Sequence, residues 1–211
     1  MSIASQFGIV PFDSATLISL LGDYKSAKDK VSSLEKKGEI IRIRKNLYVN
    51  APQLVHVDIS KQLLANHIYG PSYISFQTAL ALYGLIPERV VTYYSASTKR
   101  KKQFTTPFGT FEYRTIPQQY FSIGITQNII EHTYTYLIAS PEKALCDTIL
   151  LYTHRIQSKK AMFEYLIEDM RIDFSALHNL RLGIVNQCIE YGYKKKELTF
   201  LFEILQDEYR I

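Results

Sequence analysis

The sequence of 211 residues contains no tryptophan and only two cysteines, Cys146 and Cys188. Because these two lie far apart and neither has a second cysteine nearby, the sequence does not support a zinc knuckle or a CxxC redox site. Both fall in apolar helical patterns, so we expect them to be buried thiols. No apolar run approaches the roughly 18 residues of a membrane helix, and the first residues lack the pattern of a signal peptide. We therefore expect a cytoplasmic protein that does not enter a membrane.

The motifs of common enzymes are also missing. Neither a GxxxxGKS/T phosphate loop nor a GxSxG nucleophile elbow occurs. Glu142 and Asp147 are five residues apart, a spacing that does not place two carboxylates on one helix face. Asp147, beside Cys146 in an apolar helical run, is interpreted as a packing or capping residue. The histidines show no HxxxH or HExxH spacing: His56, His67, His132, His154 and His178. We expect no enzymatic activity, no cofactor and no metal.

Positive charge is concentrated in one short segment. Between Lys25 and Lys45 there are eight Lys or Arg and three Asp or Glu, an excess of five. The formal charge of the whole chain is also +5, so the remainder is neutral. A local pool of positive charge is the electrostatic footprint of a nucleic-acid-binding unit.

The N-terminal residues are predicted to form two helices and a hairpin. A helix over 12–21, capped by Asp13 or Ser14, ends at Gly22. A second helix begins at Ser26 and ends at Gly38, a residue suited to the position after a helix. Residues 39–49 alternate as a β-hairpin with its turn at Lys45-Asn46, where Asn tolerates the left-handed conformation. Residues 2–9 form either a stub helix or part of an abbreviated domain.

The second helix and the hairpin together predict a DNA-binding winged helix. With Ala27, Val31 and Leu34 inward, short polar groups and cations point outward, as in a helix that enters the major groove. Arg42 and Arg44, two apart on one strand, are expected to project from the same face and to form the wing with Lys45. The predicted DNA contacts are Lys25, Ser26, Lys28, Lys30, Ser32, Ser33, Lys36, Lys37, Arg42, Arg44 and Lys45.

Each of these features has a simpler interpretation when it is taken alone. Lysines on a surface helix are usually solvated, and an Arg-x-Arg strand can protect a sheet edge from aggregation. The order of helix, glycine and hairpin, together with the concentrated charge, favours DNA binding. Because the helix carries no Arg, Asn or Gln, we expect most contacts to be with phosphates and base readout to be modest.

The sequence predicts two domains. A winged helix over 1–52 is followed by a mixed α+β domain over 53–211, which ends in a helical bundle. Helices are expected near 58–69 and 75–84, and strands over 89–96, 111–116 and 133–139. Ser140-Pro141-Glu142 is a strong helix start. Further helices are expected near 158–170, 174–182, 185–191 and 195–209.

Two further basic runs were considered as binding surfaces. Lys99, Arg100, Lys101 and Lys102 fall in a predicted loop, either a solvated tip or a secondary contact for nucleic acid or an acidic partner. Lys194–Lys196 stands at the start of the last predicted helix, where cations oppose the helix dipole. A solvated cap is the favoured interpretation of that second run.

Four segments of the chain resemble AbiEi-type antitoxins of type IV toxin–antitoxin systems. They are KKGEIIRIRKNLYVNAP (Lys36–Pro52), YISFQTALALYGLIPERV (Tyr73–Val90), TPFGTFEYRTIP (Thr106–Pro117) and ASPEKALCDTILL (Ala139–Leu151). The family commonly has a glycine at the place of Asn46. No single motif is diagnostic, but the four segments occur in the family's order and span most of the chain.

The resemblance implies a repressor that binds inverted repeats of double-stranded DNA in its own promoter. It also implies an antitoxin that counters a nucleotidyltransferase-like toxin without a stable complex. DNA binding would belong to the N-terminal domain and antitoxicity to the C-terminal domain. We expect a monomer or weak dimer in solution that is paired on DNA. The alternatives are an enzymatic antitoxin, a kinase or nuclease acting on the toxin or its targets, and a ligand-sensing regulator without a toxin partner.

Overall fold

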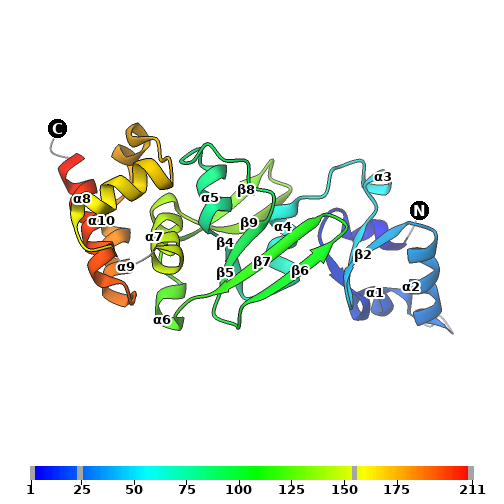
Figure 1. The fold of residues 1–211 in the computed structure, drawn as a ribbon. Helices are drawn as coiled ribbons and strands as arrows, with labels where there is room; N and C mark the ends of the chain where they lie inside the picture. The colour runs from blue at the N-terminus through cyan, green and yellow to red at the C-terminus, as the bar shows by residue number, and fades with distance from the viewer. Residues whose placement is uncertain (1–2, 23–25, 154–155, 209–211) are drawn as a thin grey trace.

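The computed structural model describes residues 3–22, 26–153 and 156–208, and it has a mixed α+β architecture (Figure 1). A small N-terminal unit lies at one end, a six-stranded sheet in the middle, and the C-terminal helices at the other end. The expectation of an α+β fold is therefore confirmed. Among the described residues, no helix has both the length and the apolar character that crossing a bilayer requires.

The N-terminal unit combines two helices with a three-stranded antiparallel sheet of order β1-β3-β2. Asp13 caps the first helix by accepting a hydrogen bond from the Thr16 amide at 2.6 Å. Gly22 and Gly38 follow the two helices with φ of 57° and 68°, which suits glycine. The elements are the 3₁₀ helix η1 (Ile3–Phe7), β1 (Phe12–Asp13), α1 (Ser14–Leu21), α2 (Ala27–Lys36), β2 (Ile40–Arg44) and β3 (Leu47–Asn50).

The β2–β3 hairpin contributes to two hydrophobic cores. On one side, Ile40 and Tyr48 pack with α1 and α2 residues such as Leu17 and Leu34. On the other side, Ile43, Leu47 and Val49 belong to the large core of the rest of the chain. Both faces of the hairpin are therefore packed against hydrophobic residues. This packing restricts the motion of the hairpin relative to the six-stranded sheet.

The central sheet has the strand order β6-β7-β5-β4-β9-β8. β4 pairs with β9 and β5 with β7 in parallel, while the remaining neighbours are antiparallel. The predicted strands correspond to β5, β7 and β9, but three others were not predicted. The bounds are β4 (Ser72–Ile74), β5 (Tyr93–Ser97), β6 (Lys102–Thr106), β7 (Gly109–Thr115), β8 (Ile125–Ile130) and β9 (Tyr134–Ala139).

Helices α4 and α5 flank the sheet strands, and the C-terminal helices gather around α7 (Figure 1). The predicted start of α7 is confirmed, because the Ser140 hydroxyl accepts a hydrogen bond from the Lys143 amide at 3.3 Å. The helices are α3 (Pro52–Val55), α4 (Lys61–Ile68), α5 (Phe76–Leu82), α6 (Gln118–Phe121), α7 (Pro141–Tyr152), α8 (Lys159–Glu164), the π-helical η2 (Tyr165–Asp169), the 3₁₀ helix η3 (Phe174–Asn179), α9 (Leu182–Tyr191) and α10 (Lys195–Glu208).

Lys194, the first residue of the basic run at the start of α10, is held by the protein rather than by solvent alone. The Lys194 ammonium donates to the Thr153 carbonyl at 2.7 Å and to the Thr153 hydroxyl at 2.9 Å. It therefore supplies donors to the carbonyl end of α7, where a cation is favourable. The expectation of a solvated cap was wrong for Lys194.

Candidate nucleic-acid interface

The outer face of α2 is polar and exposed, as the sequence predicts. Val31 and Leu34 are buried against the small core, and Ala27 is half-buried beside them. The opposite side forms an open depression of ≈ 460 Å³ lined by Asp29, Ser32, Ser33, Lys36 and Lys37. The inward and outward residues therefore separate as expected for a helix that docks with one face and presents the other.

The lysines on this face remain available for a ligand. Lys28, Lys36 and Lys37 are exposed, and none of them is ion-paired within the ranges that the structure describes. Ser32 donates from its hydroxyl to the Lys28 carbonyl at 3.2 Å, so one of the two serines is partly occupied by its own helix. Ser26 precedes the helix as its exposed cap residue, and Lys30 is half-buried at the side. Lys25 lies outside the described residues.

Arg42 is held against α2 rather than projecting freely. Its Nη2 lies 2.6 Å from Oε2 of Glu35, and its guanidinium stands 5.6 Å from the centre of the Tyr48 ring. The hydrogen bond to Glu35 raises the pKa of Arg42. The side chain is still 52% exposed, so one edge of the guanidinium faces solvent. Its positive charge is partly balanced by Glu35.

Arg44 points to a different part of the molecule, because the pairing of β2 with β3 shifts between the two arginines. Arg42 lies opposite Tyr48, whereas Arg44 lies opposite Leu47. The Arg44 Nε donates to the carbonyl of Ile68 at 2.8 Å, at the end of α4. The expectation that both arginines share one face was wrong, since it assumed an unbroken alternation. Lys45, at the exposed turn, remains at the tip.

The second basic run is not a simple loop, because Lys102 begins β6 and its neighbours contact the protein. Lys101 lies 3.8 Å from Glu112, and Lys99 donates to the carbonyl of Gly70. The ammonium groups of Lys99 and Lys102 lie 5.3 and 5.7 Å from the centre of the Tyr69 ring. Both distances fit cation–π contacts.

Tyr69 joins this run to the hairpin, a role that the sequence did not reveal. Its hydroxyl donates to the carbonyl of Arg100 at 3.3 Å, and the preceding residue, Ile68, accepts the bond from Arg44. The two basic segments, far apart in sequence, therefore meet at the end of α4. The Arg100 side chain is exposed. Only the position of Tyr69 directly before the Gly70-Pro71 helix stop gave a local signal.

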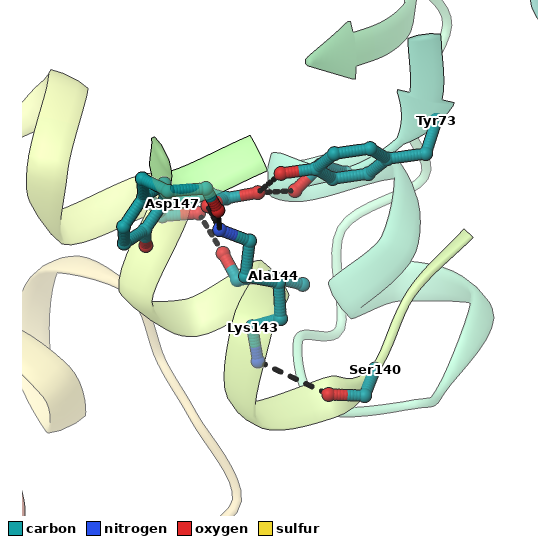
Figure 2. Close-up of polar contacts among 8 residues, drawn as sticks. Tyr73, Ser140, Lys143, Ala144 and Asp147 are labelled. Atoms are coloured by element: carbon teal, nitrogen blue, oxygen red, sulfur yellow. Dashed lines mark hydrogen bonds and ion pairs between the residues drawn. The ribbon is translucent and has the colours of Figure 1, made fainter. Parts of the chain in front are cut away.

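A buried network of polar side chains lies inside the C-terminal part (Figure 2). Asp147 accepts hydrogen bonds from the hydroxyls of Tyr73 at 3.0 Å and Ser75 at 2.5 Å, and Lys143 lies 3.2 Å from its other oxygen. Lys143 also donates to the carbonyl of Tyr120 at 2.9 Å. The Lys143 and Asp147 side chains are completely buried, so their partners are protein groups and not a ligand from solvent. This network ties α7 to β4, as a packing role for Asp147 predicts.

The cysteines are both buried and unbridged. Burial, reinforced by a hydrogen bond to Cys188, raises the pKa of Cys146, which makes its thiol a poor nucleophile. Within the residues that the structure describes, no three His, Cys, Asp or Glu side chains gather as a possible metal site.

The sequence was compared with protein-family models and with curated proteins. No protein-family model matches the chain, and no curated protein matches it significantly.

Proposed function

We propose that this protein is a transcriptional repressor that binds double-stranded promoter DNA with a winged helix made of α2 and the β2–β3 hairpin. One observation carries the proposal above the others: the outer face of α2 presents Lys36 and Lys37, which have no ion pair among the described residues, beside Ser32 and Ser33. A rigid helix with cations at the rim and short polar groups at the centre fits the major groove and its bordering phosphates.

The residues divide between holding the backbone and reading the bases. Lys28, Lys36 and Lys37 would contact phosphates. Ser33 would reach base edges or further phosphates, since its hydroxyl, unlike that of Ser32, makes no hydrogen bond among the described residues. Lys45 at the hairpin tip would meet the flanking backbone. Such a set gives strong, salt-dependent affinity but little sequence information. Sequence specificity would then require two copies of the protein bound to an inverted repeat. In solution the protein would be a monomer or a weak dimer.

The junction at Tyr69 supports a longer contact. Arg100 is exposed, whereas Lys99 and Lys102 are held on the Tyr69 ring and Lys101 is paired with Glu112. Of the four cations, Arg100 is the best placed to reach DNA that extends past the wing. The ring fixes the segment from which it projects.

The antitoxin role rests on the resemblance of the four segments to AbiEi-type proteins. In this scheme the operon also encodes a nucleotidyltransferase-like toxin, and the C-terminal domain counters its effect without a stable complex. The part of the chain after residue 53 has a large core, which the hairpin residues Ile43, Leu47 and Val49 also join, and a buried polar network, so it is packed well enough to carry a function of its own.

The deciding experiment measures binding to the promoter duplex by fluorescence anisotropy at several salt concentrations. Replacing Lys36 and Lys37 together by Ala should weaken binding to every sequence and reduce the slope of log K against log salt by about two. The matched control is Lys159→Ala with Lys160→Ala, an adjacent lysine pair on α8, which should leave both quantities unchanged. An unaltered slope in the α2 double variant would remove α2 from the interface.

Co-expression with the neighbouring nucleotidyltransferase tests the second role separately. The α2 double variant should lose repression of a promoter reporter and still rescue growth. Loss of rescue in that variant, with the protein folded, would contradict the assignment of antitoxicity to the C-terminal part.

A further inference from the structure

A cavity of ≈ 520 Å³ lies in the C-terminal part, and none of its lining residues belongs to the candidate nucleic-acid interface. Its walls come from α5, the segment 86–92, β5, α7 and the α8–η2 helix. This volume falls within the range of small-molecule sites. The cavity takes part neither in the candidate nucleic-acid interface nor in the buried polar network around Asp147.

One wall has an irregular backbone. Tyr165 and Asp169, the first and last residues of the π-helical turn η2, both line the cavity. Single π turns inside helices are rare and occur frequently at functional sites. Arg171, two residues later, has φ of 51° and pairs with Glu88 on the segment 86–92. The ion pair joins two walls of the cavity and so holds its shape.

The charged groups among the described lining residues are two carboxylates, Glu88 and Asp169. The hydroxyls of Thr92, Tyr94 and Tyr165 can donate as well as accept. Asp169 has no ion pair within the described ranges. The amide oxygen of Gln77 is buried and makes no hydrogen bond in the described structure. An unsatisfied buried acceptor is costly, and a donor from a ligand would relieve it.

The remaining lining is apolar or aromatic. Tyr94 and Tyr165 face the same space as Ile86, Val90, Val91 and Met170. Val91 is 81% exposed, although a valine is usually covered in a folded protein. The Thr148 hydroxyl is already committed to the carbonyl of Ala144 at 2.8 Å. The apolar and aromatic side chains of the lining can therefore contact a flat apolar ligand. A hydrogen-bond donor on that ligand would find two kinds of acceptor, a carboxylate and an amide oxygen.

We propose that this cavity binds a small organic cation that carries a flat apolar body, such as an aromatic amidine or amine. The cation would lie at Asp169, a donor of the same group would reach the Gln77 amide, and the apolar body would contact the two tyrosines. An anion of the same shape is disfavoured, because Glu88 and Asp169 repel it and the described lining residues include no cation. A neutral isostere would retain the apolar contacts and lose the charge pairing.

The test titrates the full-length protein with benzamidine, benzamide and benzoate, which share one shape and differ in charge. We expect saturable binding of benzamidine, at least about tenfold tighter than benzamide, and no saturation with benzoate. Methyl NMR should show the benzamidine shifts concentrated at Ile86, Val90, Val91 and Met170. Equal binding of the three probes, no saturation with benzamidine, or shifts spread elsewhere would overturn the proposal.

Charge pairing is tested by Asp169→Asn, a change at an exposed carboxylate that leaves the core intact. It should weaken benzamidine about tenfold and leave benzamide unchanged. The matched control is Asp58→Asn, another exposed aspartate outside the cavity lining, which should alter neither affinity. Unchanged benzamidine affinity in Asp169→Asn would overturn the assignment of the cation to this carboxylate. DNA binding is measured separately, so either proposal can fail alone.

Discussion

Lys143 and Asp147, four residues apart on α7, form an ion pair at 3.2 Å with both side chains fully buried. Lys160 and Glu164 on α8 have the same spacing and lie 3.7 Å apart, but their side chains are 86% and 50% exposed. The two pairs share the same spacing on a helix, but one is buried in the protein and the other is exposed to water. Water screens the second pair, whereas the first has only protein groups to stabilise its charges.

Asp147→Asn should therefore lower the free energy of unfolding by roughly 3–5 kcal/mol, because it leaves the buried Lys143 ammonium without its counter-charge. Urea unfolding followed by circular dichroism provides the measurement. Glu164→Gln is the control and should change stability by less than about 1 kcal/mol, as expected for an exposed pair. A loss below about 1 kcal/mol in Asp147→Asn would show that the network contributes little to stability.

Several buried tyrosines should make the protein sensitive to alkaline pH. Burial raises the pKa of Tyr152 to about 12 and raises the pKa values of Tyr73 and Tyr120 well above 10. The folded state then holds these protons more tightly than the unfolded state. The contribution of each tyrosine to stability is complete below pH 10 and is lost as the pH rises through its folded-state pKa, which is about 12 for Tyr152.

The ultraviolet absorbance of tyrosinate should consequently show two phases. Exposed tyrosines should ionise near pH 10 with the circular dichroism unchanged, and the buried ones should ionise only as the fold is lost. In 6 M guanidinium a single phase near pH 10 is expected. Ionisation of every tyrosine near pH 10 in a protein that remains folded would contradict the burial of these hydroxyls.

Glu35→Gln should strengthen DNA binding, if α2 and the hairpin bind DNA as proposed. The substitution removes a negative charge beside the DNA-facing surface and releases the Arg42 guanidinium, which now lies 2.6 Å from Glu35. We expect an affinity gain of roughly 2–5-fold at moderate salt and a steeper salt slope by about one. Glu190→Gln, at an exposed glutamate on α9, should have no effect. Weaker binding in Glu35→Gln would mean that Glu35 is needed to position Arg42.

Local signals in the sequence predicted α1, α2, the β2–β3 hairpin and the start of α7, but Phe12 and Asp13, expected in the first helix, form β1. Asp13, Ser140 and the glycines after α1 and α2 act through their own backbone neighbours, so their roles can be read from adjacent residues. The strands β6 and β8 were missed, because a lysine run opens one and the polar Thr126–Asn128 interrupts alternation in the other.

Contacts between distant segments could not be predicted in the same way. The separation of Arg42 from Arg44 depends on a register shift, and the junction at Tyr69 depends on packing between residues about 30 positions apart. The cavity likewise requires five elements to meet. Such features follow from tertiary packing, which the periodicity of a single segment does not encode.

Asn46, at the hairpin turn, has φ of 63° and therefore occupies the left-handed region. Asn46→Ala should lower the free energy of unfolding by about 1–2 kcal/mol, because a β-carbon without a compensating polar group is strained there. Asn46→Gly, the residue common in the resembling family, should be neutral or raise stability by up to about 1 kcal/mol. Urea unfolding of both variants gives the comparison. The control is Asn186→Ala, the same change within α9 at an exposed helical position, which should instead stabilise the protein by a few tenths of a kcal/mol. If alanine stabilised the protein at both positions, the turn at Asn46 would not require the left-handed conformation.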